Sequence, residues 1–135
     1  VSLVTANSAT SASVFTSSAS FGQALWGDAV FYTGSAISPT AGGYLAAWWL
    51  KSIDGGTTFE STTGSSGTGL ARPPDFLIPF STVAYGSSNQ IFASGIVKMP
   101  WPAAKLYVQN NSGITLATSS NAYSTIKIGP VAVQY

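Results

Sequence analysis

Few side chains in this sequence could act as acids, bases or nucleophiles. The only carboxylates are Asp28, Asp54, Glu60 and Asp75, and the chain has no cysteine and no histidine. Those two absences exclude a Ser-His-Asp triad, a cysteine nucleophile, a disulfide framework and metal sites built from thiolate or imidazole ligands. A glycoside hydrolase would need two of the four carboxylates facing each other across a cleft.

The positions of the carboxylates do not favour catalysis. Asp54 begins an Asp-Gly-Gly turn, where aspartate ordinarily caps its own backbone. Glu60 follows on the other arm of the same short hairpin, so both groups are expected to project outward into solvent. Asp75 is expected to pair with Arg72 or to cap a loop. We predict a protein that is not an enzyme, with no catalytic, cofactor-binding or metal-binding residues and no cofactor; the enzymatic alternative is a hydrolase that uses Asp54 and Glu60.

The composition is unusual in its lack of charge. Charged residues make up 7% of the 135 residues, whereas about 25% is typical of soluble domains. Polarity comes from 35 serines and threonines, and the net charge is +1. The five basic residues are scattered singly, which argues against a nucleic-acid partner. No apolar run approaches the ~20 residues of a membrane-spanning helix, so no membrane partner is expected. The surface is therefore either rich in hydroxyl groups or covered by other protein.

Aromatic side chains supply the candidates for binding. Trp48 and Trp49 are adjacent, so in a strand they point to opposite faces of the sheet. We expect Trp48 to join the core and Trp49 to lie outside beside Lys51. An outward indole is covered by the domain's own loops, by a neighbouring subunit or by a stacked sugar, because its exposure is costly. Aromatic anchors in a charge-poor patch are typical of interfaces, and the predicted interface comprises Val14, Phe15, Trp48, Trp49, Lys51 and Trp101.

Short β-branched and aromatic runs, separated by turn residues, predict an all-β fold. The predicted strands are 24–33, 43–53, 57–61, 75–83, 90–98, 104–109, 114–117 and 123–128. Pro79 limits the fourth of these to an edge or to a bulged position. Strict alternation in the fifth places Val97 with Ile91 and opposite Phe92. About eight short strands favour a single-domain β-sandwich over 21–135, with jelly-roll or Greek-key connections. Residues 1–20 form an Ala/Ser/Thr-rich N-terminal arm, either disordered or ordered against a neighbouring subunit.

Several short motifs in the middle and at the end of the chain form a pattern when taken together. They are Trp48-Trp49-Leu50, Asp54-Gly55, Phe59-Glu60, Arg72-Pro73-Pro74-Asp75-Phe76, Pro79, Lys105, Val108, Asn110-Asn111, Gly113 and the closing Pro130-Val131-Ala132-Val133-Gln134-Tyr135. Over about residues 44–135 this pattern resembles small virion structural proteins of tailed bacteriophages. The resemblance implies an accessory β-domain of the head or the tail, without assigned catalytic residues. Residues 1–43 lie outside it.

We therefore predict a non-enzymatic virion protein, located in the virion and forming a homodimer or homotrimer. The first hypothesis is a capsid decoration (cement) protein that binds the major capsid protein and stabilises neighbouring capsid subunits. One alternative is a tail or fibre accessory protein bound to a tail protein. Another is a carbohydrate-binding module for host attachment, which would bind a surface glycan through Trp49, Trp101, Tyr107 and Gln109.

Overall fold

The computed structural model describes residues 9–16, 26–33, 37–62, 69–80, 90–99, 103–116 and 124–131. These residues contain seven strands: β1 (Ala9–Thr16), β2 (Trp26–Thr33), β3 (Tyr44–Ser52), β4 (Phe76–Pro79), β5 (Gln90–Lys98), β6 (Ala103–Asn111) and β7 (Ser124–Pro130). Within this part of the chain, no helix is long and apolar enough to cross a membrane.

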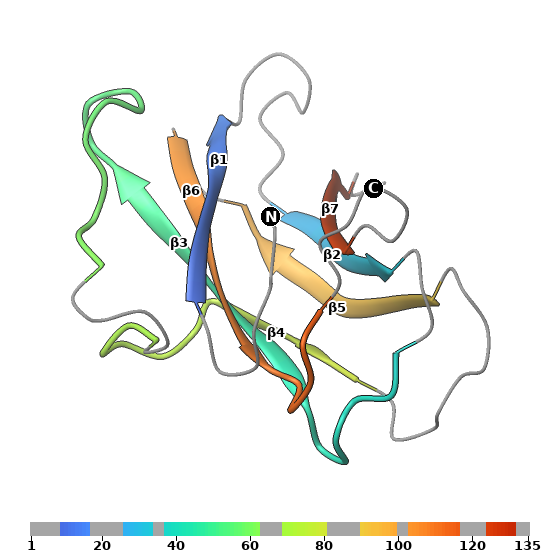
Figure 1. Cartoon of the computed structure of the whole chain (residues 1–135). Helices are drawn as coiled ribbons and strands as arrows, with labels where there is room; N and C mark the ends of the chain where they lie inside the picture. Colours follow the sequence, from blue (N-terminus) through green and yellow to red (C-terminus); the bar gives the residue numbers. More distant parts are fainter. Residues whose placement is uncertain are drawn as a thin grey trace.

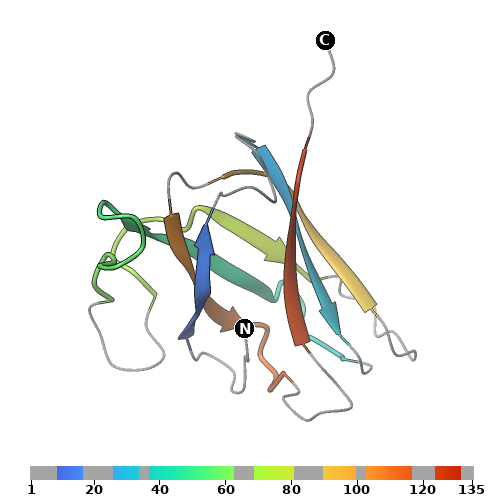
Figure 2. The same ribbon diagram turned by 90° about the horizontal axis from the view of Figure 1, so that it is seen from above.

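The strands form two antiparallel sheets that lie face to face (Figures 1 and 2). The four-stranded sheet has the order β1-β6-β3-β4, and the three-stranded sheet has the order β5-β2-β7. Side chains from both sheets join in one buried cluster. The all-β class is therefore confirmed, and the two packed sheets are consistent with a β-sandwich.

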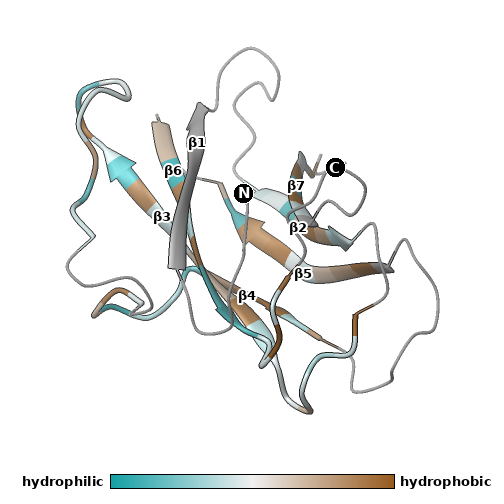
Figure 3. Cartoon of the chain, viewed as in Figure 1, coloured by the Kyte–Doolittle hydropathy of each residue, from teal (hydrophilic) through white to brown (hydrophobic). Residues whose placement is uncertain are grey.

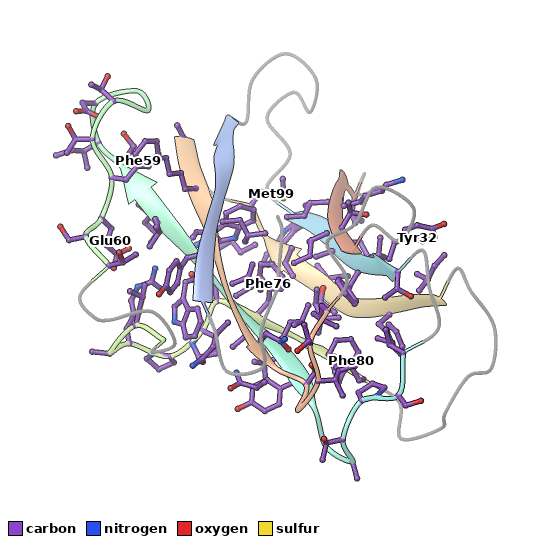
Figure 4. All side chains as sticks on the ribbon, viewed as in Figure 1. Tyr32, Phe59, Glu60, Phe76, Phe80 and Met99 are labelled. Carbon is purple, nitrogen blue, oxygen red and sulfur yellow. The ribbon has the colours of Figure 1, made fainter. Side chains whose placement is uncertain are left out.

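Aromatic rings fill much of the space between the sheets. Phe31 of β2 packs against Phe80 and Phe92, with ring centroids 5.5 and 6.3 Å away, and the last two rings meet edge to face at 4.9 Å. On the opposite sheet, Leu45 and Trp49 of β3 point into the same interior. Each large apolar side chain buried in this way contributes about 1.5–3 kcal/mol to folding. Figure 4 shows the labelled Phe76 and Phe80 between the two sheets.

The alternation predicted for β5 is wrong because the strand contains a bulge. Asp28 pairs with Ile96 and Val30 with Ala93, so one residue of β2 faces two residues of β5, one of which is Gly95. Gly95 has φ of 82°, in the left-handed region that a glycine adopts readily. The extra residue reverses the alternation of side chains beyond the bulge. As a result, Phe92 and Val97 are both buried, and Ile91 and Ile96 are both exposed. The bulge thus brings Ile91 and Ile96 to the same outer face.

Several predicted strands are confirmed, and others are not. The strand predicted at 43–53 is present as β3, and β4 with its Pro79 lies at the edge of the described four-stranded sheet. Residues 57–61 are not a strand, although Glu60 N donates to Lys51 O at 3.0 Å. Residues 114–116 are not a strand either. Within the predicted N-terminal arm, residues 9–16 form β1 and pair with β6 of the same chain.

The bulge in β5 gives a testable prediction about Gly95. Gly95→Ala should destabilise the domain by about 1–2 kcal/mol, because an L-residue is strained in the left-handed region. Gly129→Ala is the matched control, since a Cβ there meets no atom within 4 Å and its φ is not positive. Urea denaturation of both variants measures the difference, and equal midpoints would contradict the assignment.

Candidate functional site

Strand β3 is buried on both of its faces. Trp49 lies in the interior between the sheets, where its Nε1 donates to Lys98 O at 3.1 Å. Trp48 lies on the outer face of the four-stranded sheet, in a second buried cluster formed by Ala46, Trp48, Leu50 and Tyr107 with Phe59 and Leu70 packed against it. Both indoles are 3% exposed. The prediction that Trp48 joins the main core and Trp49 lies outside is therefore wrong: the two faces are reversed, and neither indole needs another polypeptide to cover it.

The cover over Trp48 comes from the chain that follows β3. Figure 2 shows the green segment after β3 on the side of the four-stranded sheet that faces away from the other sheet. Trp48 Nε1 donates to Arg72 O at 2.9 Å. A Cβ at Gly69 would stand only 2.6 Å from Cη2 of the indole. Only glycine, which has no Cβ, therefore lets the backbone come this close to the Trp48 ring. The domain's own loop thus accounts for the burial of Trp48.

Arg72 holds this cover in place through four hydrogen bonds. Its Nε and Nη2 donate to the two carboxylate oxygens of Glu60, each at 3.0 Å, and its Nη1 donates to Asp75 at 2.9 Å. Nη2 also donates to Trp49 O at 2.8 Å, while Asp75 accepts from Trp49 N at 2.7 Å. We call Arg72, Glu60, Asp75 and the backbone of Trp49 the Arg72 clasp. It confirms the predicted pairing of Asp75 with Arg72.

The clasp shifts the protonation equilibria of its members. Hydrogen bonds and charge from Arg72 hold the pKa of Glu60 below its ordinary value, and Glu60 together with Asp75 raises the pKa of Arg72. An isolated ion pair whose side chains are each about one-third exposed contributes little to the free energy of unfolding. The interactions of Arg72 should contribute more than an isolated pair does, because its guanidinium binds Glu60 with two hydrogen bonds and is held in a fixed geometry by Asp75 and a backbone carbonyl.

Asp54 has a structural role in the turn after β3, as predicted. Its Oδ1 accepts from Ser52 Oγ at 2.7 Å and from the backbone N–H groups of Thr57 and Thr58 at 3.2 and 2.8 Å. Hydrogen bonds from these residues hold the pKa of Asp54 well below its usual range, and those from the side chain and backbone of Thr58 have the largest effect. Glu60 is exposed, as predicted, but it is not a free carboxylate, because Arg72 binds both of its oxygens.

Two hollows meet at Phe59, beside the Arg72 clasp. The larger, of about 650 Å³, is lined by Lys51, Ile53, Asp54, Thr58, Phe59, Glu60 and Arg72. The smaller, of about 390 Å³, is lined by Leu50, Phe59, Glu60, Ser61, Thr62, Lys105 and Tyr107. The Lys105 ammonium stands 4.4 Å from the centre of the Phe59 ring. We call the two hollows together the Phe59 site; Figure 4 labels Phe59 and Glu60 on the segment that follows β3.

A second distinctive surface is the outer face of the three-stranded sheet. Ile91 and Ile96 of β5 are 65% and 70% exposed, and Trp26 of β2 is 42% exposed. Their register partners place them on one face, because Ile91 pairs with Tyr32 and Ile96 with Asp28. The figure coloured by hydropathy shows brown stretches on β5 and β2 (Figure 3). Strict alternation along β5 would place Ile91 and Ile96 on opposite faces, so the sequence pattern alone does not predict this surface. The Ser94-Gly95 pair inside the strand is the signal for the bulge.

Among the described residues of the predicted interface, the two tryptophans are not exposed to a partner. Trp48 and Trp49 are both buried, on opposite faces of β3, whereas Lys51 lines the larger hollow and the backbones of Val14 and Phe15 pair with β6. Trp101 lies outside the described residues.

The predicted sugar-binding residues separate in the same way. Trp49 belongs to the core and Trp101 lies outside the described residues, whereas Tyr107 lines the smaller hollow. Gln109 accepts a hydrogen bond from Asn111 at 3.1 Å. Phe59, which the sequence analysis did not single out for binding, lies at the centre of the hollows, and only its place beside the turn hinted at a surface position.

Comparison with known proteins identifies no relative. The chain matches no family model, no curated protein and no solved structure. Among the described residues, no three acidic side chains come together in a group that could hold a metal ion.

The Arg72 clasp predicts a specific loss of stability. Arg72→Lys keeps the charge but cannot reach Glu60, Asp75 and Trp49 O together, so we expect a loss of about 1–2 kcal/mol in the free energy of unfolding. Lys127→Met, on the other sheet, is the control and should change it by less than about 0.5 kcal/mol. Urea denaturation followed by indole fluorescence makes the measurement, and an unchanged midpoint for Arg72→Lys would refute the role of the clasp.

Acid should weaken the clasp through Glu60. Because the folded-state pKa of Glu60 is lowered, its contribution is complete above its ordinary pKa of 4.5 and is lost as the pH falls through the lower folded value. The free energy of unfolding should therefore decrease as the pH drops from about 5 toward 3. Glu60→Gln should show a shallower decrease over the same range. Parallel curves for the two proteins would contradict this assignment.

Proposed function

We propose that the chain is a non-enzymatic structural protein of a bacteriophage virion, and that it attaches to a neighbouring virion protein through the outer face of the three-stranded sheet. The observation that supports this proposal is the exposure of Ile91, Ile96 and Trp26 on one sheet face. Single exposed apolar residues are ordinary, but several on one continuous face are typical of an interaction surface.

The distribution of charge supports the same proposal. Six of the nine charged side chains lie at the Arg72 clasp and the Phe59 site, whereas the three-stranded sheet carries only Asp28, Lys98 and Lys127. Those three charges lie on the same outer face as the apolar residues, because Asp28 pairs with Ile96, Lys98 with Trp26 and Lys127 with Val30. A face that combines exposed apolar side chains with a few charges has the mixed make-up of many protein–protein interfaces.

The proposed partner is the major capsid protein, with the chain acting as a decoration protein that bridges neighbouring capsid subunits. Attachment to a tail or fibre protein through the same face is the alternative. Because every connection between successive described strands except β3 to β4 passes from one sheet to the other, we also propose a jelly-roll or Greek-key connectivity. Self-association as a dimer or trimer belongs to the same proposal, since repeated copies would share one attachment surface.

The proposal is tested by the double variant Ile91→Ser/Ile96→Ser. Both side chains are mostly exposed, so the variant should fold with nearly unchanged stability but lose at least tenfold in affinity for particles that lack the protein. Ile53→Ser is the matched control, because Ile53 is 99% exposed but follows β3 of the other sheet. Quantitative mass spectrometry of purified, reconstituted particles measures occupancy.

Two results would count against this proposal. Full occupancy by Ile91→Ser/Ile96→Ser would rule out the sheet face as the attachment surface. Absence of the protein from purified virions would rule out the virion function itself.

A further inference from the structure

We propose that the Phe59 site binds a neutral saccharide. This binding function is separate from attachment through the three-stranded sheet, because the Phe59 site lies on the outer side of the other sheet (Figures 2 and 4). The inference therefore does not depend on the proposed virion function.

The shape of the site suits more than one sugar ring. Its two hollows, of about 650 and 390 Å³, fall within the range usual for ligand sites. They share Phe59 and Glu60, so a chain that passes this pair can occupy both hollows. An oligosaccharide can place one ring in each hollow, whereas a single small metabolite would fill only one.

Phe59 provides an apolar platform whose position is fixed before a ligand arrives. The ring packs against the buried cluster that contains Trp48, Leu50 and Tyr107, and it lies under the Lys105 ammonium at 4.4 Å. Phe59 remains partly exposed and lines both hollows. A pyranose ring carries C–H groups on its face, which pack on an aromatic ring, and hydroxyl groups around its rim.

Polar groups with fixed orientations surround the platform. Arg72 orients the Glu60 carboxylate, and each of its oxygens can accept a further hydrogen bond from a sugar hydroxyl. The hydroxyl groups of Thr58, Ser61 and Thr62 and the ammonium of Lys51 add donors and acceptors around the same hollows. Because Glu60 is already ordered, little conformational entropy is lost when a ligand binds it.

The balance of charge selects a neutral ligand. The site and its clasp hold three cations and three anions: Lys51, Arg72 and Lys105 against Asp54, Glu60 and Asp75. Arg72 uses four hydrogen bonds on Glu60, Asp75 and Trp49 O, so its guanidinium is engaged and not available as a phosphate clamp. A site with no net charge and many hydrogen-bonding groups matches a hydroxyl-rich ligand better than an anion.

The experiment titrates the full chain with neutral oligosaccharides and follows backbone amide shifts by NMR. The probes are maltohexaose, cellohexaose and chitohexaose, with trigalacturonate as the anionic comparison. We expect at least one neutral probe to shift residues 50–62 and 105–107 with a Kd of about 1 mM, as for a small open site. Phe59→Ala should weaken this binding about tenfold, whereas Phe59→Tyr, which keeps the ring, should not.

The controls separate this proposal from the virion function. Ile91→Ser/Ile96→Ser should bind the saccharide as the unaltered chain does, and Phe59→Ala should occupy particles normally. No shift at 10-fold excess over the expected Kd for any neutral probe, shifts outside the Phe59 site, or binding of trigalacturonate alone would overturn the saccharide proposal. None of these results would bear on attachment through the three-stranded sheet.

Discussion

A strand that buries large side chains on both of its faces needs a cover on each side, and β3 is such a strand. The second sheet covers Trp49, and the segment after β3 covers Trp48. Arg72 binds both tryptophans: its backbone carbonyl accepts a hydrogen bond from the Trp48 indole, and its guanidinium donates one to Trp49 O. A buried indole N–H without an acceptor would be costly. The path of the loop is therefore set by the need to satisfy Trp48, and the carboxylates of Glu60 and Asp75 keep Arg72 in the required position.

This requirement also explains where a chain with so few charges places them. Holding a loop without regular secondary structure over a sheet takes directional interactions, since such a loop has few ladder hydrogen bonds of its own. Charge-assisted bonds supply them at Arg72, and backbone donors bound to Asp54 fix the preceding turn. The three-stranded sheet needs no such loop, so its outer face keeps apolar side chains such as Ile96 in contact with solvent. Six of the nine charges thus gather at the loop over the four-stranded sheet and beside it, and three lie on the other sheet.

The sequence predicts what depends on local pattern and fails where distant segments decide. The all-β class, the strand at β3, the edge position of Pro79 and the capping role of Asp54 follow from composition and turn chemistry. The orientation of Trp48 and Trp49 does not, because both faces of β3 are apolar and only the packing of the second sheet distinguishes them. The reversal of alternation in β5 depends on Gly95, whose positive φ a strand pattern does not reveal. Phe59 gains its place in a site because it packs on the cluster around Trp48 and because Arg72, twelve residues beyond Glu60, binds that carboxylate.

The two proposed surfaces are compatible in one molecule because the sandwich separates them. A domain seated on a particle through the outer face of β5 and β2 would direct the opposite side, with Phe59 and its hollows, away from the particle (Figure 2). Exposed apolar groups such as Ile91 would then be covered by protein. The hydroxyl and charged groups around Phe59 would stay in water and would be accessible to a glycan. Each environment suits the chemistry of its own side chains. The loop that covers Trp48 therefore makes the two outer faces chemically different, and the two proposals assign a different kind of partner to each.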